Sequence, residues 1–229
     1  MKGGIKLEIA ILAGDKEIII PDSVINFVIV GILLLIFALV VNKKAKDVDP
    51  EKAPSTFLNV VELIVDTVNN FVISTMGKHN LRFAPYILTL FILILCSNLF
   101  GLLGFTSPTS DYSVTFSLAL VTFGIVQVNA IKSAGGFGKY LKGFLDPLPF
   151  LLPLNIAGEL ANPVSLSFRL FGNVLSGSLI MSLLYSFLGY LAPIIAPPFH
   201  IYFDIFSGVL QAFIFTMLTM VFIAGATEE

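Results

Sequence analysis

The chain has 229 residues, 56% of them hydrophobic and only 12% charged, with a formal net charge of −2. Its mean hydropathy of +0.95 lies outside the range of soluble globular domains. A helix needs about 20 residues to cross a bilayer, which leaves room for five or six spans but not for a second, soluble domain. We therefore expect an all-α integral membrane protein with one domain over residues 1–229, and no nucleic-acid partner.

The N-terminal part is expected to stay outside the cell. Residues 1–23 form this external segment, and the apolar run at 7–13 is too short to predict a cleaved signal. Residues 24–41 carry no charge and predict the first span. Three lysines between Lys43 and Lys46 follow it and mark its cytoplasmic end.

The next two predicted elements differ in character. At 55–75, apolar residues recur at helical spacing while Glu62 and Asp66 occupy the other face, which predicts an amphipathic helix on the membrane surface. Residues 83–131 are apolar apart from a short turn at 106–112. They predict a hairpin of two spans.

The C-terminal part, residues 150–224, predicts a second hairpin of two long helices. The polar pattern continues across Pro163, so 150–191 is expected to be one long, kinked or steeply tilted helix. The prolines from Pro193 to Pro198 predict the turn, and 199–224 the last helix. Five spans result, plus the surface helix.

Basic residues are distributed unevenly between the connections. The two short outer turns hold none, whereas the inner connections hold Lys43, Lys44, Lys46, Lys52, Lys78, Arg82, Lys132, Lys139 and Lys142. By the positive-inside rule the N-terminus is outside and the C-terminus cytoplasmic.

A polar strip follows one face of the first long helix and is centred on Arg169. At about 100° per residue, five polar residues lie within roughly 40° of it: Asn155, Asn162, Ser165, Asn173 and Ser176. The last helix has its own strip, made of His200, Asp204, Ser207 and Gln211. The two strips predict polar surfaces inside the membrane.

Charged side chains inside a membrane are energetically costly, so the presence of Arg169 and Asp204 there requires an explanation. An ionisable group at the bilayer centre costs about 2.5 to 3.5 kcal/mol on insertion scales. One explanation is an ion pair of Arg169 with Asp204 or Glu159 that joins two helices. The other is an ion path, which the further neutral polar residues on both helices favour.

The motifs around these residues resemble those of subunit a of the bacterial F-type ATP synthase. They are Pro163-Val164-Ser165-Leu166, Arg169-Leu170-Phe171-Gly172-Asn173, the run from Gln211 to Thr219, Ser97-Asn98-Leu99-Phe100-Gly101-Leu102 and Pro108-Thr109-Ser110-Asp111. The resemblance covers most of the chain from Val24 onward.

The resemblance implies a non-catalytic stator subunit in the bacterial plasma membrane, without a cofactor or bound metal. It would form two offset half-channels against a ring of c subunits, beside peripheral-stalk b subunits and lipids. Arg169 matches the family's essential arginine, Gln211 the glutamine that faces it across the two helices, and Asn173 belongs to the arginine motif. Asn155 and Asn162 are further candidates for the path.

The sequence departs from the family at one titratable position. The family often has Glu or His nine residues past the arginine, where this chain has Ser178. Seven residues before Gln211 stands Asp204, which would then be the main outer relay, with His200 supporting it or capping the entrance. We expect H⁺ as the coupling ion, with Na⁺ as the alternative.

Two functions from other classes fit the sequence less well. An intramembrane hydrolase would use Ser207 beside His200, or Asp204 with a second membrane aspartate, but the chain has neither that aspartate nor a G-x-S-x-G motif. A secondary transporter would usually show an internal repeat, and we find none. The chain also lacks a G-x-x-x-x-G-K-[ST] phosphate loop.

Overall fold

The computed structural model describes residues 9–13, 16–46, 55–145 and 148–228. Within these ranges the α-helices are α1 Asp22–Lys46, α2 Thr56–Met76, α3 Ala84–Leu99, α4 Tyr112–Ser133, α5 Phe137–Gly143, α6 Leu152–Leu188, α7 Ala192–His200 and α8 Ser207–Glu228. Short 3-10 segments connect them: η1 Lys78–Phe83, η2 Phe100–Leu103, η3 Pro108–Ser110, η4 Pro149–Leu151 and η5 Gly189–Leu191. A π-helical segment, η6 Ile201–Phe206, joins α7 to α8.

The predicted fold class is confirmed. The described residues contain five stretches that are long and apolar enough to cross a membrane, judged by length and composition: Asp22–Lys46, Thr56–Met76, Lys78–Leu103, Tyr112–Ser133 and Pro149–Thr227. The division differs from our expectation, because α2 is counted among them and the two long C-terminal helices form one continuous stretch. The surface location of α2 therefore stays a prediction.

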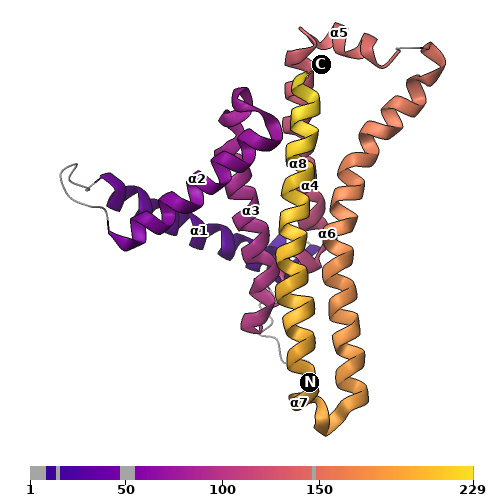
Figure 1. Ribbon diagram of the computed structural model, residues 1–229. Coiled ribbons are helices and arrows are strands. Elements are labelled where there is room, and N and C mark those ends of the chain that lie inside the picture. The colour runs from indigo at the N-terminus through magenta and orange to yellow at the C-terminus, as the bar shows by residue number, and fades with distance from the viewer. Residues whose placement is uncertain (1–8, 14–15, 47–54, 146–147, 229) are drawn as a thin grey trace.

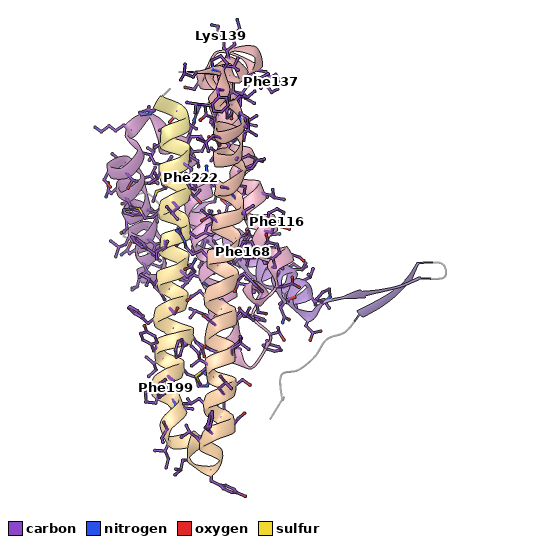
Figure 2. All side chains as sticks on the ribbon, turned by 90° about the vertical axis from the view of Figure 1, so that its right-hand side faces the viewer. Phe116, Phe137, Lys139, Phe168, Phe199 and Phe222 are labelled. Carbon is purple, nitrogen blue, oxygen red and sulfur yellow. The ribbon has the colours of Figure 1, made fainter. Side chains whose placement is uncertain are left out.

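A small β-hairpin precedes the helices, and the sequence analysis did not predict it. Strands β1 Ile9–Ala13 and β2 Lys16–Ile20 are antiparallel, with Ile9 opposite Ile20. Figure 2 shows the hairpin projecting away from the helices.

Helix α1 is attached to the rest of the protein through its first turns. The Ser23 hydroxyl donates to the Asp111 carboxylate at 2.8 Å, and the Asn26 amide donates to the Thr106 carbonyl at 2.8 Å. Beyond Val30, α1 is mostly exposed and apolar. The turn of the first predicted hairpin is thus the anchor for α1.

Two apolar clusters hold the helices together. The first joins α3, α4, α6 and α8 through Leu90, Ile94, Leu118, Ala119, Leu166, Leu170, Ala212 and Phe215. The second joins α2, α3 and α8 through Val72, Met76, Ala84, Ile87, Met220, Ile223 and Ala224. Because α8 contributes to both, its buried face is fixed from two sides, and α6 is held beside it.

Helix α6 continues through Pro163, as predicted, and runs antiparallel to α7–α8 (Figure 1). Its 37 residues correspond to about 55 Å, well beyond a hydrocarbon core of about 30 Å. The N-terminal part of α6 leans away from α8 in Figure 1, consistent with the missing N–H of Pro163. A helix of this length must be steeply tilted to remain within a bilayer.

The predicted position of the C-terminal turn is wrong. The chain reverses at η5, where Gly189 has a positive φ of 48°, and the prolines from Pro193 to Pro198 lie inside α7. The first turn of a helix has no internal use for its N–H groups, so Pro193 fits there without loss.

Candidate ion path along α6 and α8

Arg169 lies in the middle of α6 with an exposed side chain. Within the described ranges, this side chain forms neither a hydrogen bond nor an ion pair. The two carboxylates that were considered as its partners have other contacts: Glu159 accepts from Gln127, and Asp204 contacts His200. An in-chain ion pair therefore does not explain why Arg169 is present.

One pair of hydrogen bonds joins the two polar strips directly. The Ser207 hydroxyl donates to Asn173 Oδ1 at 2.8 Å, and Asn173 Nδ2 donates to the Ser207 carbonyl at 3.4 Å. Because α6 and α8 are antiparallel, one turn further along both helices brings Arg169 to the same level as Gln211. The Asn173–Ser207 contact thus sets the register of the candidate path.

Gln211 is on the inner side of this register. Its side chain is only 6% exposed, and its Nε2 has no hydrogen-bond partner among the described residues. Leaving a buried donor unsatisfied costs about 1 to 3 kcal/mol, so the position is unfavourable for stability alone. Arg169 points outward at the same level, so a side chain from another subunit has access to the arginine.

Towards the η5 turn, three side chains form a hydrogen-bonded chain. His200 Nδ1 lies 2.5 Å from Asp204 Oδ2, and the Tyr185 hydroxyl lies 2.7 Å from His200 Nε2. Asp204 stands in the π-helical segment η6, a type of segment frequent at functional sites. The prediction that His200 accompanies Asp204 agrees with this geometry, whereas Tyr185 was not foreseen.

Ser178 does not join this group. Its hydroxyl donates to the Leu175 carbonyl in its own helix at 2.8 Å, and Ser207 is engaged with Asn173. The hydroxyls of Ser178 and Ser207 and the carboxylate of Asp204 are the nearest candidates for Na⁺ ligands, and each of them has another contact within the chain. Among the described residues, no group of three or more His, Cys, Asp or Glu side chains could hold a metal ion.

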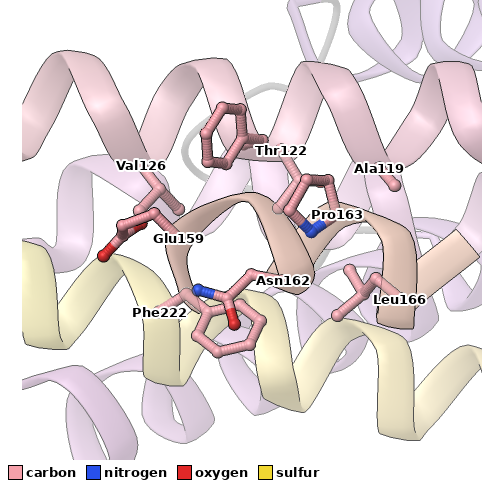
Figure 3. A pocket seen from close by; sticks show the side chains of 9 residues that line it. Ala119, Thr122, Val126, Glu159, Asn162, Pro163, Leu166 and Phe222 are labelled. Carbon is pink, nitrogen blue, oxygen red and sulfur yellow. The ribbon is translucent and has the colours of Figure 1, made fainter. Parts of the chain in front are cut away.

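On the other side of Arg169, polar residues of α4, α5 and α6 meet. Gln127 Nε2 donates to Glu159 Oε2 at 2.8 Å, and the Tyr140 hydroxyl donates to Gln127 Oε1. Glu159 and Asn162 line a small, open pocket between α4, α6 and α8 (Figure 3). Asn155 Nδ2 donates to the Phe144 carbonyl at 3.0 Å. Asn155 therefore contacts the segment that follows α5, and Asn162 turns towards the pocket.

The predicted strip of α6 is thus divided among four surroundings, of which the contact of Asn155 with Phe144 is one. Ser165, Arg169 and Ser176 are exposed, Asn173 contacts α8, and Asn162 faces the pocket. Gln127 and Tyr185 were missed because a single polar residue in an apolar run gives no periodic signal. The carboxamide of Gln127 is recognised only from its contact with Glu159.

The comparisons with known proteins agree on one family. The family model described as ATP synthase A chain matches residues 24–224. ATP synthase subunit a of Trichlorobacter lovleyi is 36% identical over 219 residues, 92% of this chain and 90% of that protein. The subunit a of Legionella pneumophila subsp. pneumophila is 38% identical over 176 residues, covering 76% and 74% of the two chains.

A third relative has a more specific name. It is "ATP synthase subunit a, sodium ion specific" of Propionigenium modestum, 37% identical over 214 residues, 86% of this chain and 71% of that protein. The family match extends from the start of the first predicted span to Ala224 in α8 and includes every candidate site residue. This chain therefore belongs to the ATP synthase A chain family and is a non-catalytic, ion-translocating stator subunit of the bacterial enzyme.

Proposed function

We propose that this subunit forms two offset half-channels against the c ring and that Arg169 separates them. The observation that carries this proposal is the exposed guanidinium without a partner in the described part of the chain. A guanidinium stays protonated in proteins and so keeps its positive charge. A fixed positive charge here attracts an ionised ring carboxylate and repels cations that would leak from one half-channel to the other.

The role of Arg169 follows from this charge. A ring carboxylate that reaches the guanidinium is stabilised in its ionised form, so it releases its ion before it arrives. Gln211 lies at the same level, and Asn173 with Ser207 keeps α6 and α8 in register. The Asn173–Ser207 contact thereby keeps the arginine at a constant level relative to α8 while the ring turns.

The outer half-channel runs from the η5 turn to Arg169, and Asp204 is its main titratable group. Between Leu170 and Gln211 it is the only carboxylate in the sequence. The inner half-channel lies on the side of Glu159 and Asn162, with Asn155 further towards the N-terminal end of α6.

The c ring covers the exposed face of Arg169, and peripheral-stalk b subunits and lipids cover other apolar surfaces. The N-terminus lies outside and the C-terminus in the cytoplasm.

We propose H⁺ as the coupling ion. The Asp204 carboxylate contacts an imidazole, which can pass a proton. The sodium-specific relative from Propionigenium modestum favours the alternative. In that case Asp204 and nearby oxygens would serve as ligands for a hard cation.

The test uses the purified ATP synthase complex in liposomes at fixed ionic strength. ATP addition should acidify the lumen, and raising NaCl from trace to millimolar should leave both ATP hydrolysis and acidification unchanged. The c ring should co-purify with this subunit. Several-fold stimulation by NaCl, with Na⁺ protecting the ring carboxylate from a carbodiimide, would show that Na⁺ is the coupling ion. An isolated subunit without a ring would overturn the stator proposal.

A further inference from the structure

The end of the α6–α7 hairpin is a place where membrane and water meet. Phe187 is 89% exposed and Tyr190 fully exposed on either side of Gly189. Tyrosine side chains collect at the membrane–water interface because they combine an apolar ring with a polar hydroxyl. The turn between α6 and α8 holds no lysine or arginine, so the positive-inside rule puts this interface on the outer side.

One polar chain leads from this interface towards the middle of the helices. The Tyr185 hydroxyl contacts His200 Nε2 at 2.7 Å, and His200 Nδ1 contacts Asp204 Oδ2 at 2.5 Å. Tyr185 is 44% exposed, and the side chains of His200 and Asp204 are 37% and 31% exposed. The chain therefore begins at a tyrosine near the hairpin turn and ends at a carboxylate that is less exposed than either neighbour.

No other charged group competes for these contacts. From Leu170 to Leu210 the sequence has only Asp204 and His200 as charged or basic side chains, and the other titratable residues are Tyr185, Tyr190 and Tyr202. The nearby serines of α6, Ser178 and Ser186, donate to carbonyls in their own helix. The end of α3, which also packs near η6, carries no charged residue.

We propose that Tyr185, His200 and Asp204 form the outermost part of the proton path, with Tyr185 as the group that receives the proton from water. This inference rests on the proposed function and adds a residue that lies outside the family motifs. His200 thereby supplies the second titratable group that Ser178 lacks. His200 does so from α7, which faces α6 across the hairpin, and it lies one helical turn nearer the outer surface than Asp204.

The proton balance of this relay is simple. A hydronium ion gives a proton to the Tyr185 oxygen while Tyr185 gives its hydroxyl proton to His200 Nε2. One O–H bond of hydronium and the original tyrosine O–H bond break, a new tyrosine O–H bond and the Nε2–H bond form, and the hydronium becomes water. His200 releases its Nδ1 proton to Asp204 Oδ2 and remains neutral. After Asp204 passes its proton inward, the His200 imidazole returns to its Nδ1–H tautomer, either by a flip of the imidazole or by proton exchange with water. The partial exposure of His200 permits both.

The sharpest variant is Tyr185→Phe, because it removes one oxygen and keeps the ring. Tyr190→Phe is the matched control, since Tyr190 is exposed on the same hairpin and has no hydrogen bond to any described residue. ATP-driven acidification of proteoliposomes should fall several-fold for Tyr185→Phe and stay at the wild-type rate for Tyr190→Phe. Equal rates for the two variants would overturn the relay.

Two further measurements distinguish a relay from a structural contact. Tyr185→Phe combined with His200→Ala should be no slower than His200→Ala alone, because members of one chain are not additive. Imidazole should partly restore acidification by His200→Ala and leave Asp204→Asn unchanged. If Tyr185→Phe fails to assemble, the imidazole response decides, and its absence overturns the relay.

The same preparations separate this inference from the proposed function. A slow Asp204→Asn variant with a normal Tyr185→Phe variant contradicts only the entry role of Tyr185. Wild-type pumping by Asp204→Asn contradicts the outer half-channel itself.

Discussion

Asp204 and Arg169 carry opposite charges on neighbouring segments of the C-terminal hairpin, yet the two side chains do not form an ion pair with each other. Asp204 contacts His200, and Arg169 has no partner within the described ranges. Opposite charges in direct contact would attract strongly in a medium of low dielectric constant. Their separation is what an ion path requires, because a closed ion pair would neither exchange protons nor meet a passing carboxylate.

Asp204→Asn should slow ATP-driven transport strongly between pH 6 and pH 9, because a carboxamide neither takes up nor releases a proton in this range. Asp204→Glu should have a mild effect, since it keeps the carboxylate. Transport is followed as initial acidification rates across this pH range. An Asp204→Asn complex that transports at the wild-type rate throughout would refute the role of this residue.

What the sequence could predict at the residue scale depended on motifs and spacing. Arg169, Gln211 and the His200–Asp204 pair stand out because charged or amide groups recur at helical spacing in an apolar stretch. The burial of Gln211 could not be predicted, since which face of α8 packs inward depends on α3 and α4. The role of Tyr185 could not be predicted either, because its hydrogen-bond partner, His200, lies on the other side of the turn.

At the scale of elements, the helices were more predictable than the connections. α2 and α6 begin and end within a few residues of the predicted 55–75 and 150–191, because apolar periodicity marks their extent. The C-terminal turn was misplaced because proline was taken as a break, whereas Gly189 supplies the backbone conformation that reverses the chain. The π-helical segment at Asp204 has no sequence signal that we recognise.

The contact among α4, α5 and α6 depends on Gln127. Gln127→Ala removes the donor to Glu159 and the acceptor of Tyr140, so it should destabilise this junction by about 1 to 3 kcal/mol. The measurement is thermal unfolding of the detergent-solubilised complex. Val128→Ala, at an exposed neighbouring position, is the control. Equal unfolding temperatures for the two variants would argue against the role of Gln127.

At the scale of the whole molecule, the two ends of α6 differ in the residues around them: lysines lie near one end and exposed aromatic residues near the other. The lysines at 139 and 142 lie in α5 beside its N-terminal end, and exposed aromatics surround its C-terminal end (Figures 1 and 2). Charge asymmetry orients membrane proteins because basic loops are retained in the cytoplasm. The orientation is the part of the account that the sequence predicts and the fold leaves open.

Single cysteines test this orientation in a Cys96→Ser background. In inverted membrane vesicles, whose cytoplasmic face is outward, Lys139→Cys should react with a membrane-impermeant maleimide. Tyr190→Cys should react only after the vesicles are permeabilised. The opposite pattern would reverse the topology, and with it the assignment of Tyr185 to the outer side.

The central claim is that the charge of Arg169 acts on the c ring rather than on folding, and ATP-driven acidification by Arg169 variants tests it most directly. Arg169→Ala should assemble with the ring and pump no protons, whereas Val164→Ala, an exposed apolar position on the same helix, should pump normally. Arg169→Lys should not restore the full rate, because an ammonium lacks the planar fork and can lose its proton in an apolar site. Vesicles with Arg169→Ala that still acidify, or take up Na⁺, on ATP addition would contradict the account.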